Sequence, residues 1–226
     1  MNTAIIVAAG KSERMGNNID KAFVNLGSKP VVVWSMLAFE QCPDVDQIIL
    51  VVRRDQMLAA KGLAQMFGIS KIRKIINGGN KRQDSVICGL KEMDPDTRYV
   101  IVHDGARPCV KPELISETIK QARKNGCAVT ASKIWDTVKV GGKSNMVDHT
   151  IDRTKLWAVA TPQAAEAELL KKAYADVVEK KLTVTDEAGA VEAAGKPVRI
   201  VEWSRPNIKI TTAEDIPLAA AAIQIV

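Results

Sequence analysis

The sequence predicts an α/β fold built on a doubly wound, mainly parallel sheet. One observation predicts it. Short runs rich in β-branched residues alternate along the first half of the chain with stretches of helical apolar periodicity. Strands separated by helices of about 10–15 residues are typical of βαβ units, which form parallel sheets.

The elements of this first half follow one another regularly. The predicted strands cover residues 3–8, 47–52, 72–76, 99–103 and 127–134. The helical patterns between them cover residues 31–41, 56–67, 83–93 and 112–125. Because such sheets bind ligands beyond the carboxyl ends of their strands, we expect the site in the loops that follow the strands.

The second half of the chain is less regular. Residues 136–140 and 146–151 flank a glycine-rich turn and predict a β-hairpin. Its two strands carry few core-sized apolar residues, so we expect the hairpin to project from the body. The other predicted elements are a strand at 156–160, helices at 164–180 and 186–194, a strand at 198–201 and a final helix at 213–225. Without a visible linker, residues 1–226 are expected to form one domain that includes an arm at 136–153.

The composition narrows the class of protein. The net charge is +6, but the basic residues are scattered, and 4% aromatic residues leave little surface for stacking bases. A small anionic substrate therefore fits better than a nucleic acid. The four cysteines show no Cys-x-x-Cys spacing, which indicates core thiols rather than a zinc site. With no apolar stretch near the ~18 residues of a membrane span and no presequence, a soluble cytoplasmic protein is expected.

The loop after the first predicted strand has the composition of a phosphate-binding loop. Residues 8–16 read Ala-Ala-Gly-Lys-Ser-Glu-Arg-Met-Gly, and Lys21 follows. Glycines let backbone N–H groups approach an anion, and the cations neutralise its charge. A Walker A motif needs Lys after its last glycine, but Asn17 follows Gly16, and a dinucleotide motif needs Gly where Ser12 stands. The loop predicts a nucleotide but not an ordinary kinase, GTPase or dehydrogenase.

Polar segments follow other predicted strands. Asp104 stands beside Gly105, where α/β enzymes place a carboxylate that binds a metal or a sugar, and Arg107 could hold a phosphate. A turn capped by Asp104 is the alternative. The glycine loop that begins at Asn77 enters a helix near Ser85, where free N–H groups could meet a base or a phosphate, although it could equally be a plain connection. Weaker candidates are a turn expected at 161–163, a helix cap at 183–187 and a strand-like segment at 207–211.

The absences favour one chemistry. The sequence has only two histidines, no Gly-x-Ser-x-Gly motif and no recognisable Cys–His spacing. It therefore offers few residues from which a hydrolytic triad or a zinc site could be built. The remaining Arg, Lys, hydroxyl and Asp side chains suit transfer of a phosphoryl or nucleotidyl group, in which catalysis is mostly positioning and charge stabilisation. A phosphate nucleophile is already ionised at neutral pH and would need no general base.

An ordered set of segments carries a resemblance to a known family. They lie at residues 8–21, 78–85, 102–108, 136–139, 152–157, 161–163, 185–188 and 207–211. From residue 3 to about 216 the chain closely resembles the 2-C-methyl-D-erythritol 4-phosphate cytidylyltransferases. The resemblance implies a Rossmann-like nucleotidyltransferase fold and a step of non-mevalonate isoprenoid biosynthesis. In that step CTP and 2-C-methyl-D-erythritol 4-phosphate, with Mg²⁺, give 4-diphosphocytidyl-2-C-methyl-D-erythritol and pyrophosphate.

The resemblance also implies roles for individual residues. The catalytic cations would be Arg14, Lys21 and Lys209. CTP would be held by Ala8, Ala9, Gly10, Gly79, Asn80, Ser85, Asp104 and Gly105, with Asp104 also the candidate metal ligand. The methylerythritol phosphate would be held by Arg107, Thr137, Arg153, Thr161 and Thr185. The arm would embrace a second subunit, so that Arg153 reaches the substrate of its partner in a homodimer.

One departure and two alternatives accompany this interpretation. The family usually has Pro before the catalytic lysine and Gln after it, whereas Asp20 and Ala22 flank Lys21 here, which places a negative charge beside the cation. A pentitol phosphate cytidylyltransferase, such as one that acts on ribitol 5-phosphate, differs mainly in its polyol contacts. A noncatalytic nucleotide-binding module is the third possibility, although such a module would not need Arg14, Lys21, Asp104 and Lys209 together.

Overall fold

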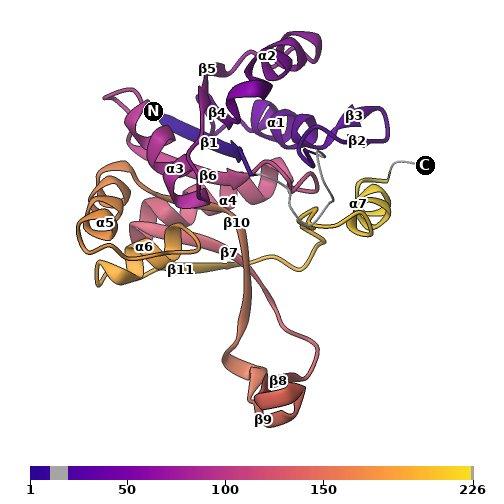
Figure 1. Ribbon diagram of the computed structural model, residues 1–226. Helices are drawn as coiled ribbons and strands as arrows, with labels where there is room; N and C mark the ends of the chain where they lie inside the picture. Colours follow the sequence, from indigo (N-terminus) through magenta and orange to yellow (C-terminus); the bar gives the residue numbers. More distant parts are fainter. Residues whose placement is uncertain (11–19, 225–226) are drawn as a thin grey trace.

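The computed structural model describes residues 1–10 and 20–224 and confirms the α/β fold (Figure 1). In this part of the chain, a sheet of seven strands has the order β11-β7-β10-β6-β1-β4-β5. The strands are β1 (Asn2–Ala8), β4 (Gln47–Val52), β5 (Ile72–Asn77), β6 (Tyr99–Asp104), β7 (Cys127–Lys133), β10 (Trp157–Glu166) and β11 (Arg199–Glu202). Among these strands only β10 is antiparallel to its neighbours, β6 and β7. The prediction of a mainly parallel sheet is therefore confirmed.

Helices cover both faces of the sheet. One face carries α1 (Val31–Gln41), α2 (Met57–Met66) and α4 (Pro112–Asn125), and the other carries α3 (Arg82–Lys91), α5 (Ala167–Glu179) and α6 (Glu187–Ala193). Successive side chains of a strand point to opposite faces. In β1, Ala4 and Ile6 accordingly join the first core cluster and Ile5 joins the second. This strand is buried on both faces, which is why its sequence is continuously apolar from Ala4 to Ala8.

Smaller elements complete the chain. A short hairpin of β2 (Asn25–Leu26) and β3 (Lys29–Pro30) packs against α7 (Asp215–Ile223), and a small apolar cluster that includes Leu26 and Ala219 joins them. Within residues 1–10 and 20–224, the single-turn helices are η2 (Arg54–Gln56), η3 (Lys143–Asn145) and η4 (Arg153–Lys155). In the described part of the chain, no helix has the length and apolarity needed to cross a membrane.

The strand predicted at 156–160 is present as part of β10, but its predicted end and the predicted start of the next helix at 164 were wrong. Strand β10 continues to Glu166, because Gln163 to Glu166 pair with β6 on one side while Ala164 and Ala165 also pair with β7 on the other. The expected turn at Pro162 is instead an irregularity within this strand, between Ala160 and Gln163. Helix α5 therefore begins only at Ala167. The last helix begins at Asp215 rather than at 213.

The predicted hairpin is present. Strands β8 (Val138–Gly141) and β9 (Val147–Ile151) pair antiparallel and form a separate two-stranded sheet. Figure 1 shows this hairpin projecting well away from the body, joined to it by the ends of β7 and β10. Most of its side chains are exposed, including Met146 and Val147 near the tip. Its use as a dimerisation arm stays a prediction.

Two helical glycines should respond oppositely to alanine. A Cβ at Gly89 in α3 would lie 2.6 Å from Cγ2 of the buried Ile5, whereas a Cβ at Gly62 in α2 would meet nothing within 4 Å. Overpacking costs about 1–3 kcal/mol, which exceeds the gain of up to about 1 kcal/mol from helix propensity. We expect Gly89→Ala to lower the free energy of unfolding in urea and Gly62→Ala to raise it. Equal stability of the two variants would contradict this packing of α3 on β1.

Candidate active site

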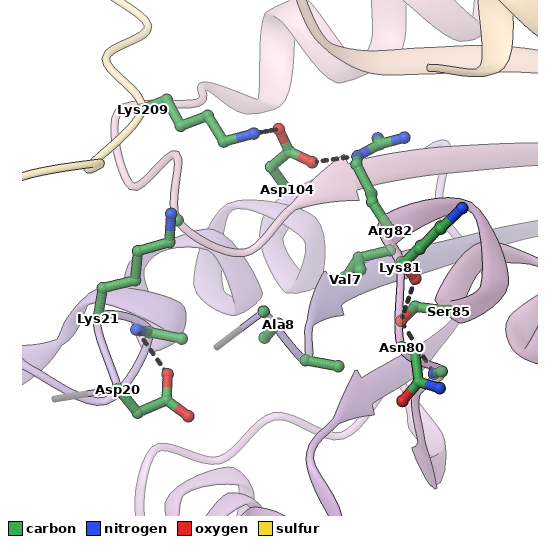
Figure 2. A pocket seen from close by; sticks show the side chains of 15 residues that line it. Val7, Ala8, Asp20, Lys21, Asn80, Lys81, Arg82, Ser85, Asp104 and Lys209 are labelled. Carbon is green, nitrogen blue, oxygen red and sulfur yellow. Dashed lines mark hydrogen bonds and ion pairs between the residues drawn. The ribbon is translucent and has the colours of Figure 1, made fainter. Parts of the chain in front are cut away.

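A pocket opens where the sequence places the candidate loops, at the carboxyl ends of β1 and β6 (Figure 2). It lies between the ends of these strands, the loop from β5 to α3 and the segment around Lys209. Its described lining is Val7, Ala8, Ala9, Gly10, Asp20, Lys21, Ala22, Gly79, Asn80, Lys81, Arg82, Ser85, Asp104, Ala106 and Lys209. Cations outnumber carboxylates in this set, so the pocket suits an anion.

Gly78 allows the loop from β5 to α3 to lie against the end of β1. A Cβ at this position would be 2.4 Å from Cβ of Ala9 and 2.7 Å from Oγ of Ser85. Ser85 holds the loop, because its Oγ accepts a hydrogen bond from the Gly79 N–H at 3.1 Å and donates one to the Lys81 carbonyl at 3.2 Å. The Ser85 side chain therefore shapes the wall that Gly79 and Asn80 present to the pocket.

Asp104 is the electrostatic centre of the site. Its Oδ1 accepts a hydrogen bond from Arg82 Nε at 2.8 Å, and its Oδ2 lies 2.7 Å from Lys209 Nζ and 3.5 Å from Arg107 Nε. Burial raises the pKa of Asp104, but the charges of Arg82 and Lys209 more than offset it, so the pKa lies well below its usual range. The carboxylate is thus ionised, and it fixes the cations around it.

Two buried side chains support Asp104 from below. The Oγ1 of Thr161 accepts a hydrogen bond from the Asp104 N–H at 3.0 Å and lies 3.1 Å from His103 Nδ1. Thr161 therefore donates its own proton to Nδ1, and His103 donates from Nε2 to the Arg107 carbonyl at 3.2 Å. Burial lowers the pKa of His103 to about 3. The imidazole is consequently neutral and structural.

Hydrogen bonds place Lys209. The Ile210 N–H donates to the Ala106 carbonyl at 2.8 Å. Arg107 Nη1 donates to the Asn207 carbonyl, and Asn207 Nδ2 donates to the Thr161 carbonyl, each at 2.8 Å. The segment 207–211 is not the strand that its sequence suggested, because these bonds are made to the loop after β6 and to β10 rather than in a regular ladder.

Lys21 and Asp20 lie at the opposite wall. Figure 2 shows the Lys21 amine extending toward Lys209 and Asp104, whereas the Asp20 carboxylate points in a different direction. Asp20 Oδ1 accepts a hydrogen bond from the Ala22 N–H at 3.2 Å, and its Oδ2 lies 3.8 Å from Arg53 Nε. Burial raises the pKa of Asp20, which the bond from Ala22 and the charge of Arg53 offset only in part. The negative charge that replaces the usual Pro is thus directed toward Arg53.

Comparisons with known proteins assign this architecture. A sequence model of the 2-C-methyl-D-erythritol 4-phosphate cytidylyltransferase family matches residues 2–225. The chain belongs to this family. It is 41% identical to the family's enzyme from Desulforamulus reducens, over 98% of this chain and 95% of that one, and 43% identical to that of Dehalococcoides mccartyi, over 96% and 93%.

Solved structures agree with the family assignment. The 4-diphosphocytidyl-2C-methyl-D-erythritol synthase of Anaerococcus prevotii superposes with a TM-score of 0.87 at 33% identity, over 99% of this chain and 96% of that one. The 2-C-methyl-D-erythritol 4-phosphate cytidylyltransferase of Thermus thermophilus gives a TM-score of 0.82 at 28% identity, over 98% of each chain. The resemblance expected from the sequence segments is confirmed, and so is the nucleotidyltransferase fold.

The structure brings together most of the residues that the family resemblance assigned to CTP and catalysis. Those that line the pocket are Ala8, Ala9, Gly10, Lys21, Gly79, Asn80, Ser85, Asp104 and Lys209. Gly105 lies behind it, where its carbonyl accepts a hydrogen bond from Ser35. Arg14 lies outside the described residues.

The residues assigned to the methylerythritol phosphate are more dispersed. Arg107 and Thr161 stand behind Asp104, and Thr161 is only 3% exposed with its hydroxyl engaged. Thr137, Arg153 and Thr185 are exposed, and none of them lines the described pocket. Their contact with a substrate stays a prediction.

Arg82 and Glu187 were the main residues that sequence reasoning missed. Arg82 lies within one of the segments that carry the family resemblance but has no role implied by it, and the sequence around Glu187 predicts only an acidic residue at a helix cap. In the structure Glu187 is buried and forms two hydrogen bonds with Arg82. Their separation of 105 residues leaves no local pattern that could have paired them.

The donor set does not amount to a magnesium site of its own. In residues 1–10 and 20–224, no group of three or more His, Cys, Asp or Glu side chains could hold a metal ion. The carboxylates that line the pocket are Asp20 and Asp104, and both Asp104 oxygens already contact cations. Magnesium usually binds through one or two carboxylates together with substrate phosphates. The Asp104 metal contact therefore stays a prediction that would require a cation to share the carboxylate.

Thr161→Val tests the support beneath Asp104. Valine keeps the shape but leaves the Asp104 N–H and His103 Nδ1 without the partner that they share in the interior. An unsatisfied buried polar group costs about 1–3 kcal/mol, so we expect a loss of at least this size in urea unfolding. The matched control is Thr154→Val, whose exposed hydroxyl bonds to Asp152 and should change stability little. Similar stability of both variants would contradict the assigned network.

Proposed function

We propose that this protein transfers the cytidylyl group of CTP to 2-C-methyl-D-erythritol 4-phosphate and releases pyrophosphate. The observation that carries the proposal is the pocket in which Lys21 faces Lys209 and Asp104 beside a glycine-bearing loop, in a chain that belongs to this family. The ribitol 5-phosphate alternative is not favoured, because the matching family and relatives are named for the methylerythritol substrate. The cytoplasmic location of this protein stays a prediction.

The reaction is an in-line displacement at phosphorus. An oxygen of the substrate's phosphate forms a bond to the α-phosphorus of CTP while the bond from that phosphorus to the bridging oxygen of the β-phosphate breaks, and pyrophosphate leaves. A phosphate oxygen is ionised at neutral pH, so no general base is needed. This agrees with a site whose histidine, His103, is buried and neutral.

Charge stabilisation supplies the catalysis. Lys21 and Lys209 stand at the pocket and would offset the negative charge that grows on the pentacoordinate α-phosphate. Asp104 holds Lys209 at 2.7 Å and so keeps its ammonium group in place before CTP arrives. We propose the same stabilising role for Arg14 on the basis of its place in the family pattern.

The nucleotide would lie across the ends of β1 and β6. The backbone of Ala8 to Gly10 would face the phosphates, and Gly79, Asn80 and Ser85 would face the cytosine from the loop before α3. Asp104 and Gly105 would lie near the ribose. We propose that Mg²⁺ enters with the triphosphate and is held mainly by its oxygens, since the described side chains offer few free donors.

The arm would complete the substrate side of the site from a second subunit. Arg107, Thr161 and Thr185 would contribute from one subunit and Thr137 from the base of the arm. Arg153, exposed in the short helix beside the arm, would reach the substrate phosphate of the partner. We therefore propose a homodimer formed through the hairpin.

Removal of either catalytic lysine should abolish most turnover while the fold survives. Loss of one transition-state cation costs about 3–4 kcal/mol, which corresponds to a fall in kcat of roughly 10²–10³ for Lys21→Ala or Lys209→Ala. Pyrophosphate release from CTP is the measurement, and Lys171→Ala on the exposed face of α5 is the control.

The same assay separates the remaining alternatives. Release with 2-C-methyl-D-erythritol 4-phosphate, but not with ribitol 5-phosphate, is the expected result, and a reaction without Mg²⁺ tests the metal. Release with neither polyol phosphate would support the noncatalytic module. Near-normal turnover in a lysine variant would refute the role given to that residue.

Mixed dimers test whether Arg153 acts across the interface. Arg153→Ala and Lys209→Ala should each be nearly inactive alone. In a random mixture half the dimers carry one of each chain, and one of their two sites keeps both residues, so activity should recover to about a quarter of wild type. No recovery in a mixture whose subunits exchange, or a monomer in sedimentation velocity, would exclude the proposed role.

A further inference from the structure

A line of alternating charges runs from the interior to the pocket. Arg82, the first residue of α3, donates from Nη1 and Nη2 to Oε1 and Oε2 of Glu187 at 2.8 and 3.0 Å. Its Nε donates to Asp104 Oδ1, and Asp104 Oδ2 contacts Lys209 (Figure 2). Glu187, whose side chain is 2% exposed, also accepts a hydrogen bond from the Tyr174 hydroxyl at 3.1 Å.

The geometry makes Arg82 an orienting group rather than a phosphate ligand. Its planar guanidinium forms two parallel bonds with Glu187, which fix the plane and therefore the direction of Nε. Although burial lowers the pKa of Arg82, the carboxylates of Glu187 and Asp104 more than offset this and raise it above its usual range. Arg82 therefore remains charged, with two carboxylates balancing it before any ligand binds.

We propose that Glu187 is a positioning residue for the transfer reaction. Through Arg82 it sets the orientation of the Asp104 carboxylate, and Asp104 in turn holds Lys209 at the reacting phosphates. This inference rests on the proposed function, because the benefit lies in the transfer step. It concerns a side chain that belongs to α6, outside the pocket lining, and acts through two intermediates.

A purely structural role would have a different signature. Glu187 is the anion farthest from the pocket in this line, and its removal leaves Asp104 as the remaining partner of Arg82 among the residues that the structure describes. Arg82 lines the pocket, so its guanidinium could then turn toward the bound triphosphate. If Glu187 is a positioning residue, its removal would therefore keep or strengthen the affinity for CTP, while Lys209 would lose its fixed position. A general loss of packing would instead weaken CTP binding and turnover together.

The test compares CTP affinity with turnover in the full-length protein. In Glu187→Gln, which keeps the shape of the side chain, we expect kcat for pyrophosphate release to fall at least ten-fold. The Kd for CTP measured by calorimetry should stay equal or decrease. The control is Thr3→Val, which removes a buried hydroxyl bonded to Thr97 and Gln47 at the other end of β1, and which should leave both values unchanged in the folded protein.

Two further variants keep the inference open to refutation. Tyr174→Phe removes only the hydroxyl that bonds to Glu187, so kcat should fall a few-fold at unchanged CTP affinity, and this variant decides the matter if Glu187→Gln does not fold. In the double variant Arg82→Gln with Glu187→Gln, kcat should be no lower than in Arg82→Gln alone, because both changes break one connection.

These experiments distinguish failure of the positioning role of Glu187 from failure of the proposed function. Unchanged kcat in Glu187→Gln and Tyr174→Phe, or a parallel loss of CTP affinity and kcat, would overturn the positioning role while the function stands. Additive losses in the double variant would overturn it too. Absence of pyrophosphate release by the wild-type protein would instead refute the proposed function.

Discussion

The ionised carboxylate of Asp104 is the interaction on which the site depends. It ends β6 near the middle of the sheet and is almost fully buried, so it requires cationic partners to remain charged. Those partners come from separate parts of the chain, since Arg82 begins α3 and Lys209 lies near the C-terminus. The Asp104 carboxylate thus holds the end of β6, the start of α3 and the segment around Lys209 together as one wall of the pocket. The surplus of positive charge that remains is what an incoming triphosphate would meet.

The sheet provides the rigidity that this arrangement needs. Thr161 in β10 and His103 in β6 satisfy the polar groups beneath Asp104, and each is nearly inaccessible to water. The wall that Gly79 and Asn80 present to the pocket is formed by close packing instead of charge, because Gly78 lets its loop lie against Ala9. Charged and uncharged walls of the pocket are therefore fixed by different means.

The features that depend on neighbouring residues could be predicted from the sequence, whereas those that depend on contacts between distant parts of the chain could not. The strands of the first half were found because each is a short run rich in β-branched or other apolar residues between helical patterns, and Asp104 was found because it follows such a run. The end of β10 was not, since Ala164 and Ala165 have no intrinsic strand preference and are extended only because β6 and β7 pair with them. The Arg82–Glu187 pair was invisible for the same reason, because only the folded sheet brings the two residues together.

The root of the hairpin restricts how this chain can vary. From Ile151 at the end of β9, one short helical turn leads into β10, which runs to the Thr161 hydroxyl beneath Asp104. An inserted or deleted residue in this stretch would change the register of a central strand and reverse the faces of its side chains. The tip is different, because Ser144 and Asn145 there are exposed and already adopt left-handed backbone conformations. Length differences among related chains should therefore concentrate at the tip, while the root keeps a constant number of residues.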